Sequence, residues 1–141
     1  MADSSYLVES LLAKGDQFED EDMVAPDLAI HEVTNALFVQ HFLLKVIKNG
    51  LAYVDKFYEA VDAQALEVVT SSKALVGEAF EIASRNGGTT HDCLFVALAL
   101  RMNLELRTLD KGQARIFESE KSRRVKEDTG SRQSRRSPES D

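Results

Sequence analysis

Short apolar runs alternate with longer segments of helical periodicity, and this alternation is the feature that most constrains the fold. Residues 23–25, 66–69 and 104–108 are the three segments predicted to be strands. The segments between them repeat apolar side chains at three and four residues, which is typical of amphipathic helices. Strands that alternate with helices predict an α/β fold with a short, mostly parallel sheet covered on both faces.

Cap and stop residues set the expected helix boundaries. Gly15 is a suitable stop for the first helix, and Asn49-Gly50 is predicted to end the helical segment that follows residue 27. Hydroxyl and carboxylate side chains precede the other apolar segments, where they can accept hydrogen bonds from free backbone N–H groups. The expected N-caps are Asp3 or Ser4, Ser71 or Ser72, and Thr89 or Thr90.

The chain has 141 residues, 43% of them hydrophobic, and a formal net charge of −7. This length and composition predict a core, and the charge disfavours nucleic-acid or membrane binding by simple electrostatic attraction. The longest apolar run, residues 93–100, is too short to span a bilayer, which takes about 20 residues. The single cysteine, Cys93, excludes an internal disulfide, and the first residues show no basic signal segment. We therefore expect a cytoplasmic protein.

The end of the chain differs in composition from the rest. Residues 121–141 carry 7 basic and 4 acidic side chains, whereas residues 1–120 carry 10 and 20. Val125 is the only aliphatic or aromatic residue between Glu118 and Asp141. Such a segment buries too little apolar surface to offset the entropy lost on ordering. We expect one domain over residues 1–117, with a short last helix from Asp110, and a disordered charged tail over residues 118–141.

Four acidic residues lie at positions that a parallel sheet can bring together. Asp3 follows the first apolar residues, and Glu32 lies one turn into the helix after the strand at 23–25. Asp92 lies one turn into the most apolar helix, and Asp110 directly follows the last predicted strand. Ligands of such sheets bind beyond the carboxyl ends of the strands. We therefore expect the four carboxylates to meet in one cleft.

Each acid taken alone has a simpler explanation, because an acid in a first helical turn complements the helix dipole. Four carboxylates in one cleft behave differently. Two of them about 4 Å apart repel by roughly 4 kcal/mol at an effective dielectric near 20. Such a group takes up protons, separates or binds a cation. Oxygen ligands without a Cys or His cluster favour Mg²⁺ or Mn²⁺, and a metal-bound water can attack a phosphodiester.

The same residues carry a resemblance to a known family. Four segments match in order and spacing: residues 3–8 (DSSYLV), 26–37 (PDLAIHEVTNAL), 90–99 (THDCLFVALA) and 106–110 (LRTLD). Over residues 1–117 the chain resembles PIN-domain nucleases, most of all the small VapC-type toxins of prokaryotic toxin–antitoxin pairs. Each segment is weakly specific alone, and the four together are moderately specific. Only Met1 and Ala2 precede Asp3, fewer apolar residues than is usual in the family, so we expect either a truncated or misassigned start or a shortened first strand.

The resemblance implies a three-layer α/β/α fold and a metal-dependent endoribonuclease that cleaves RNA. It implies that Asp3, Glu32, Asp92 and Asp110 are the catalytic and metal-binding acids, with Mg²⁺ or Mn²⁺ as the cofactor. Ser5, Asn35 and Thr108 would lie beside them, and a homodimer and a small antitoxin would be the partners. Basic residues could guide RNA to the cleft if they lie on its rim; the candidates are Lys45, Lys48, Arg101, Arg107, Lys111 and Arg115.

Other functions remain open. A PIN-like protein with a weakened metal site would act by binding a partner protein. A receiver-like or Mg²⁺-dependent phosphatase domain also has acids at strand ends, but a receiver would carry a Lys where this chain has Thr108-Leu109-Asp110. His31 and His91 directly precede the candidate acids Glu32 and Asp92. Neighbouring helical positions point about 100° apart, so a histidine does not share a face with the acid that follows it. We therefore expect these two histidines and His41 in rim or packing roles. Cys93 is expected in the core.

Overall fold

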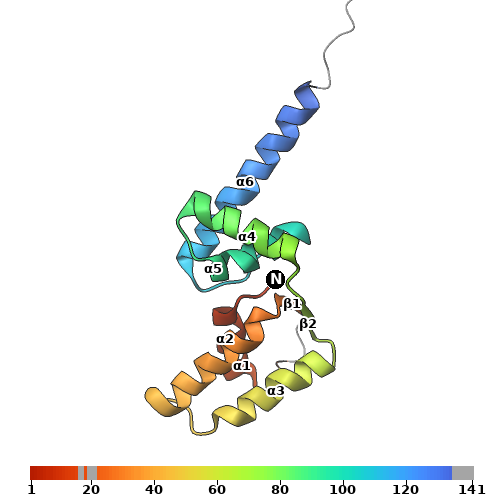
Figure 1. The fold of residues 1–141 in the computed structure, drawn as a ribbon. Coiled ribbons are helices and arrows are strands. Elements are labelled where there is room, and N and C mark those ends of the chain that lie inside the picture. Colours follow the sequence, from red (N-terminus) through yellow and green to blue (C-terminus); the bar gives the residue numbers. More distant parts are fainter. Residues whose placement is uncertain (16–17, 19–21, 135–141) are drawn as a thin grey trace, which may run out of the picture.

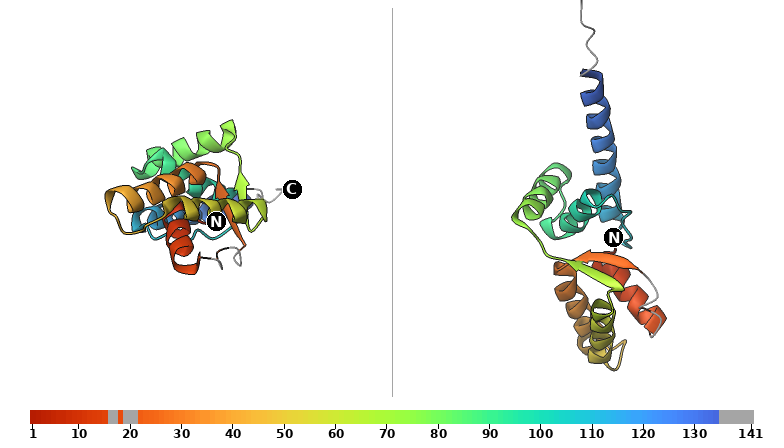
Figure 2. Two further views of the ribbon diagram at one scale, coloured as in Figure 1. Left: turned by 90° about the horizontal axis from the view of Figure 1, so that it is seen from below. Right: turned by 90° about the vertical axis from the view of Figure 1, so that its right-hand side faces the viewer.

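Two short parallel strands separate the helices of this computed structural model into two layers (Figure 1). The structure describes residues 1–15, 18 and 22–134. Three helices and one π-helical turn form a lower layer, and three helices form an upper layer, with the strands between them (Figure 2). The lower layer consists of α1 (Ser4–Lys14), α2 (Leu28–Phe38), η2 (Val39–Leu43) and α3 (Gly50–Asp62). The strands are β1 (Met23–Pro26) and β2 (Leu66–Val69), and the upper layer consists of α4 (Lys73–Asn86), α5 (Thr90–Arg101) and α6 (Lys111–Ser134).

The sheet confirms two of the three predicted strands. β1 and β2 pair in parallel, with Met23 opposite Leu66 and Pro26 opposite Val69. The prediction of a strand over residues 104–108 is wrong: within the described chain that segment forms one isolated parallel bridge, between Arg107 and Ala2. The N–H of Ala2 donates to the Val24 carbonyl (2.9 Å), so residues 1–3 lie between β1 and residue 107. The first strand is thus reduced to a bridge, consistent with the few apolar residues before Asp3.

Apolar side chains form two cores, one in each layer. The lower core includes Leu7, Leu11, Val33 and Phe57, and the upper core is built around α5. Residues 93–99 of α5 are all buried, because α4, α6 and β1 pack around this helix. Phe95 of α5 belongs to the lower core, so this helix contributes to both. The alternating strands and helices, the parallel pairing and the layered arrangement confirm the expected α/β/α class.

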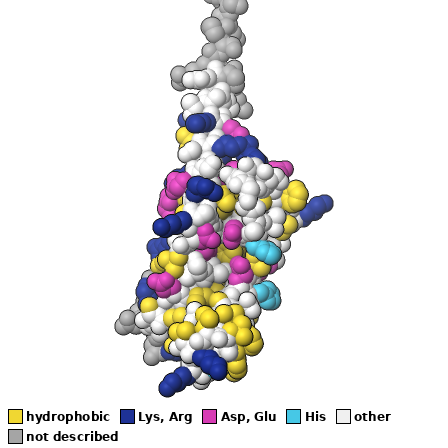
Figure 3. Space-filling model, turned by 90° about the vertical axis from the view of Figure 1, so that its left-hand side faces the viewer, with side chains coloured by type: hydrophobic (Ala, Val, Ile, Leu, Met, Phe, Trp, Pro, Cys, Tyr) yellow, Lys and Arg dark blue, Asp and Glu magenta, His cyan; other side chains and the backbone are white. Residues whose placement is uncertain are grey.

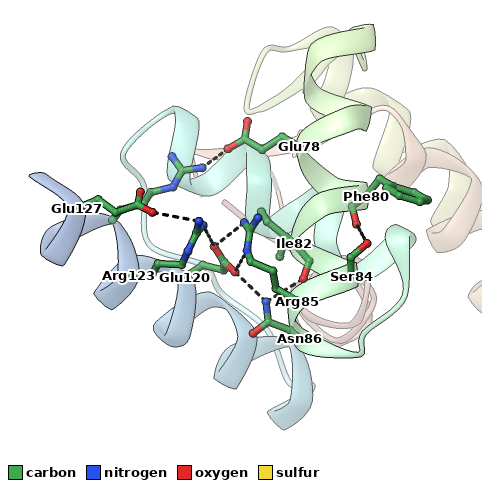
Figure 4. Close-up of polar contacts among 10 residues, drawn as sticks. Glu78, Phe80, Ile82, Ser84, Arg85, Asn86, Glu120, Arg123 and Glu127 are labelled. Atoms are coloured by element: carbon green, nitrogen blue, oxygen red, sulfur yellow. Dashed lines mark hydrogen bonds and ion pairs between the residues drawn. The ribbon is translucent and has the colours of Figure 1, made fainter.

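Helix α6 corrects the expectation for the end of the chain. Residues 118–134 continue the helix that begins at Lys111, so the prediction of disorder is wrong for them; residues 135–141 lie outside the described residues. Figure 4 shows the polar anchor that holds α6 on α4. Glu120 is only 2% exposed and accepts two hydrogen bonds from Arg85 (3.1 and 3.0 Å) and one from Asn86 (2.8 Å). An estimate based on apolar burial alone cannot detect such an anchor.

The connection from α2 to α3 also differs from the prediction. Asn49-Gly50 does not end the preceding helix; Asn49 is the N-cap of α3, and its Oδ1 accepts from the Ala52 N–H (3.2 Å). The N–H of Gly50 donates to Nδ1 of His41 (3.0 Å). A Cβ atom at Gly50 would lie 3.3 Å from both His41 and the Leu37 carbonyl, so this close approach favours glycine. His41 thus has the packing role expected of it.

Large apolar side chains are exposed where α2, η2 and the start of α3 extend beyond the sheet. We call this surface the apolar tip. Figure 3 shows hydrophobic side chains gathered at that end of the molecule. No acidic residue occurs between Glu32 and Asp55, in a chain whose net charge is −7. The apolar tip consists of Phe38, Phe42, Leu43, Leu44, Val46 and Leu51, all more than half exposed.

Candidate active site

Asp3 is a buried carboxylate at the start of α1. As the N-cap of that helix, its Oδ1 accepts from the Tyr6 N–H (3.0 Å). Ser5 Oγ donates to the same carboxylate (2.8 Å to Oδ1), and Thr108 Oγ1 donates to Oδ2 (2.8 Å). Two of the residues predicted to lie beside the acids, Ser5 and Thr108, therefore hold Asp3 directly. Hydrogen bonds to a carboxylate fix its orientation and stabilise its charge.

Thr108 connects Asp3 to a second acid through Gln113. Thr108 Oγ1 lies 2.8 Å from Gln113 Oε1 as well as 2.8 Å from Asp3 Oδ2, and its single proton serves one of them at a time. The Nε2 group of Gln113 donates to the backbone carbonyl of Asp92 (3.0 Å). Contacts at hydrogen-bonding distance thus run from the start of α1 to the first turn of α5, with Asp3 and Gln113 as alternative acceptors of the Thr108 proton.

Asp110 joins the same network from the start of α6. Its Oδ1 accepts from the Gln113 N–H (3.1 Å), and its own N–H donates to Thr108 Oγ1 (3.0 Å). Asp110 is exposed, and Asp92 is half-buried. Asp92 lies in the first turn of α5, and its N–H donates to the side chain of the N-cap Thr89 (3.2 Å). Both acids therefore occupy helix N-termini, where a negative charge is favoured.

Glu32 reaches the neighbourhood of Asp3 from α2. Its Oε1 accepts from Ser4 Oγ (2.9 Å), and Ser4 is the residue that follows Asp3. Glu32 is half-buried. Asn35, one turn further along α2, is exposed. A groove of about 640 Å³ between α1 and α2 opens beside this contact and is lined by Ser4, Ser5 and Glu32, with apolar side chains further along.

The donor chemistry suits a hard cation, because the four acids offer only oxygen ligands. In the described part of the chain, however, no three His, Cys, Asp or Glu side chains come close enough together to hold a metal ion. The carboxylates of Asp3 and Glu32 instead accept hydrogen bonds from Thr108, Ser5 and Ser4. These hydroxyl partners accommodate the two negative charges separately.

Two residues of this network, Ser4 and Gln113, were missed by the sequence analysis. Gln113 is 2% exposed and connects Thr108, Asp92 and α6. The spacing Asp110-x-x-Gln113 is that of a capping box and could have drawn attention to it. In place of the usual capping-box contact, the Gln113 side chain contacts Thr108 and Asp92. Ser4 was considered only as a cap, and its contact with Glu32 depends on how α1 packs against α2.

The remaining candidates lie as follows. Cys93 is buried in the upper core, and burial, with a smaller effect of the Asp92 charge, raises its pKa to about 11. A thiol that stays protonated at neutral pH is a core residue and not a nucleophile.

The candidate basic residues lie in different places. Arg101 forms an ion pair with Glu78 of α4 (3.0 Å), and Lys45 and Lys48 lie beside the apolar tip. Lys111 adjoins Asp110 at the start of α6, which leaves it next to the acids.

The chain is similar to known proteins in sequence and in fold. The PIN domain family model matches residues 3–118. The crystal structure of PAE2754 from Pyrobaculum aerophilum is similar in fold, with a TM-score of 0.65, 18% sequence identity, and 82% of each chain covered. No curated protein matches the chain significantly. No helix in the described residues has the length and apolar character needed to cross a membrane.

The family model covers most of the chain, and it spans all four candidate acids. The likeness to PAE2754 shows that the two chains have the same fold. PIN domains are in general nucleases that use divalent metal ions. On its sequence, its layered α/β/α architecture and its array of acids at helix N-termini, this chain belongs to the PIN domain family.

Proposed function

We propose that this protein is an endoribonuclease that uses Mg²⁺ or Mn²⁺ to hydrolyse RNA phosphodiester bonds. The observation that carries the proposal is the hydrogen-bond network that links Asp3, Thr108, Gln113 and the Asp92 backbone. It ties acids from distant parts of the sequence to one region at the starts of α1, α5 and α6. Helix packing alone does not require a buried carboxylate that accepts a hydrogen bond from a residue 105 positions away, as Asp3 does from Thr108.

In this proposal Asp3, Glu32, Asp92 and Asp110 hold the ion. A bound Mg²⁺ or Mn²⁺ would lower the pKa of a coordinated water and stabilise charge on the phosphoryl oxygens. Thr108 and Ser5 orient the Asp3 carboxylate, as hydrogen-bond partners of metal ligands do. Asn35 contributes an amide at the exposed end of the site. RNA reaches an acidic protein here because the ion itself attracts phosphate, with Lys111 beside the acids.

Substitution of Asp92 by Asn tests the proposal. Its side chain is half-buried and its helical role is carried by the backbone, so the fold should persist. We expect metal-dependent cleavage of a panel of short RNAs to fall at least about 100-fold, because the change removes a charged metal ligand. Glu105→Gln, an exposed acid outside the network, is the matched control and should cleave normally. Undiminished cleavage by the Asp92 variant would exclude this residue from the reaction.

We further propose that the protein is a VapC-type toxin held inactive by a small antitoxin. The α1–α2 groove supports this, because it combines apolar walls with Ser4 and Glu32 at one end, so that a partner segment lying in it would block the acids. Expression in a bacterial host should arrest growth for the wild-type chain and not for the Asp92→Asn variant. Co-expression of a small neighbouring gene product should relieve the arrest. Growth without arrest would contradict the toxin role.

We also propose that the protein forms a homodimer through the apolar tip. Exposed contiguous apolar surface marks interaction sites. Two copies of a chain with a net charge of −7 repel, and the tip is a surface without acidic residues where they can meet. Of the aromatic residues of α3, Phe57 is buried in the core, and Tyr53 is half-buried; they therefore contribute little to such a contact.

The dimer is tested by the double substitution Phe42→Ser with Leu43→Ser. We expect the solution mass, measured by light scattering, to halve while the melting temperature changes little, because both side chains are already exposed. Val125→Ser on α6, which is equally exposed, is the control and should leave the mass unchanged. A wild-type chain that is monomeric at high concentration would contradict the proposal.

A second candidate is a PIN-like binding protein that has lost efficient metal binding. The carboxylates of Asp3 and Glu32 accept hydrogen bonds from hydroxyl groups. In the described part of the chain, no three His, Cys, Asp or Glu side chains come together as metal ligands, and this favours the binding protein. Titration with Mn²⁺ during thermal melting separates the two functions. A bound ion stabilises the folded state, so the nuclease predicts a rise of several degrees that is lost in Asp92→Asn. No shift in the wild-type protein would favour the binding protein.

A further inference from the structure

An open cavity of about 540 Å³ lies at the carboxyl ends of the two strands, separate from the acid network. Its floor is formed where β1 passes into α2 and β2 into α4. The first turns of α2 and α5 form one wall, and α4 forms the other. The volume lies within the range of pockets that bind small molecules, and its position at the carboxyl edge of a parallel sheet is where such folds bind ligands.

The polar end of the cavity is the carboxylate of Asp27. Ser71 Oγ donates to its Oδ1 (2.6 Å) and the Ser71 N–H to its Oδ2 (3.1 Å), so the carboxylate has a fixed orientation. The Ser71 hydroxyl lowers the pKa of Asp27, which therefore stays ionised and accepts hydrogen bonds only. A carboxylate has about four acceptor positions, and these two bonds leave capacity for a ligand.

The lining also includes exposed apolar side chains of α4. Phe80 of α4 is 64% exposed, and Val76, one turn earlier, is 51% exposed. Figure 4 shows Phe80 on the side of α4 opposite to Arg85, so it takes no part in the anchor that holds α6. The described residues lining this cavity include no Lys or Arg. The negative charge of Asp27, with no basic side chain beside it in this lining, disfavours a phosphate ligand. It favours a flat, neutral ligand with N–H donors.

The cavity adjoins the proposed metal site through two shared helical turns. His31 and His91 line the cavity, and the next residues are the acids Glu32 and Asp92. Adjacent helical positions point about 100° apart, so the same turns of α2 and α5 present an acid on one side and a histidine on the other. A nucleic acid strand bound at the acids would pass close to the cavity.

We propose that this cavity binds one base of single-stranded RNA, with guanine preferred, by stacking it on Phe80 and pairing it with Asp27. Unstacked bases of single-stranded RNA stack on aromatic side chains and are read along their Watson–Crick edges. Guanine presents adjacent N1–H and N2–H donors on that edge, and each oxygen of Asp27 has acceptor capacity beyond its one bond from Ser71. This inference rests on the proposed function, since it names the sequence preference of the same nuclease.

Binding of free nucleosides tests the cavity without metal or cleavage. Guanosine, adenosine, cytidine and uridine are titrated into the full chain without added metal, and amide shifts are followed by NMR. We expect guanosine to bind most tightly, with the largest shifts around Phe80 and His91. Phe80→Ala should weaken its binding roughly tenfold, the range seen when a stacking aromatic is removed. Tyr58→Ala, an exposed aromatic on α3 outside the cavity, is the matched control and should bind normally.

Asp27→Asn separates pairing from stacking. The single oxygen of Asn can still accept from the Ser71 hydroxyl, although its NH2 group cannot accept from the Ser71 N–H. The variant should reduce guanosine binding to the level of the other nucleosides while leaving theirs unchanged. Equal binding of all four nucleosides by the wild-type chain, or guanosine binding unaffected by Phe80→Ala, would overturn the inference even if cleavage depends on Asp92. Guanosine binding lost in both variants while Asp92→Asn still cleaves would support the base site and reject the proposed catalytic site.

Discussion

Helix α5 and the apolar tip are both rich in apolar residues, but they differ in solvent exposure. Residues 93–99 of α5 are buried without exception, whereas the large apolar side chains of the tip are mostly exposed. The difference is one of position. α5 lies against the sheet between α4 and α6, while the tip extends past the end of the strands, where no other element of the described residues covers it. Apolar content therefore predicts a core here only when the topology places a neighbour on each side.

The largest expected effect comes from deleting a side chain of α5. Phe95→Ala should lower the free energy of unfolding by about 3–5 kcal/mol, because Phe95 is 2% exposed and belongs to the lower core although its helix is in the upper layer. Phe42→Ala at the tip, where the ring is 57% exposed, is the matched control and should change it by less than about 0.5 kcal/mol. Urea unfolding at low protein concentration measures both. Equal losses would mean that the tip is covered in solution.

The next effect concerns the polar anchor of α6. Glu120→Ala leaves the partly buried Arg85 and Asn86 without their acceptor and should cost about 1–3 kcal/mol. Glu118→Ala, an exposed acid on the same helix, is the control and should have little effect. Hydrogen exchange of the α6 amides gives a local readout, because loss of the anchor should release the helix before the cores unfold.

The same anchor predicts a dependence on pH. Burial alone would raise the pKa of Glu120, but the hydrogen bonds from Arg85 and Asn86 and the Arg85 charge outweigh it and lower the pKa. The anchor therefore stabilises the protein above the ordinary Glu pKa, and this stabilisation is lost as the pH falls through the lowered value. Glu120→Ala should lose less stability on acidification than the wild-type chain. An identical acid transition in both proteins would contradict the role of Glu120.

The smallest effect concerns the cap that begins α3 beside the tip. Asn49→Ala removes the acceptor of the Ala52 N–H and should cost about 1 kcal/mol. Thr70→Ala, an exposed residue outside any helix, is the control and should cost less. Thermal melting measures both. A cost near zero would show that the neighbouring contact of Gly50 with His41 holds the start of α3 without help from Asn49.

Local signals in the sequence predicted much of this structure. β2 begins and ends at the predicted residues, and Ser72 and Thr89 are helix N-caps, because strand runs and caps depend on residues close together in the chain. The failures have different causes. Residues 104–108 alternate apolar and charged side chains, yet within the described chain their one β-bridge is to Ala2, and residues 1–3 are too short a partner for a strand. The Asn49-Gly50 pattern predicts a helix stop, but the same residue types also serve as caps, and here Asn49 begins α3.

For the candidate site, the sequence identified the acids and the hydroxyls beside Asp3. It did not identify Gln113, whose role exists only because α5, α6 and residue 108 converge on it. The placement of the metal among the four acids remains a prediction.

The sequence by itself determined the order of elements, most of their boundaries and the family, since these follow from neighbouring residues and from motifs read along the chain. Only the tertiary structure decided which apolar segment is buried, how α6 is held and which groups contact each acid. These depend on contacts between residues tens of positions apart, such as Asp3 with Thr108 or Arg85 with Glu120. The energies of such contacts depend on burial and geometry, which exist only once the layers have packed.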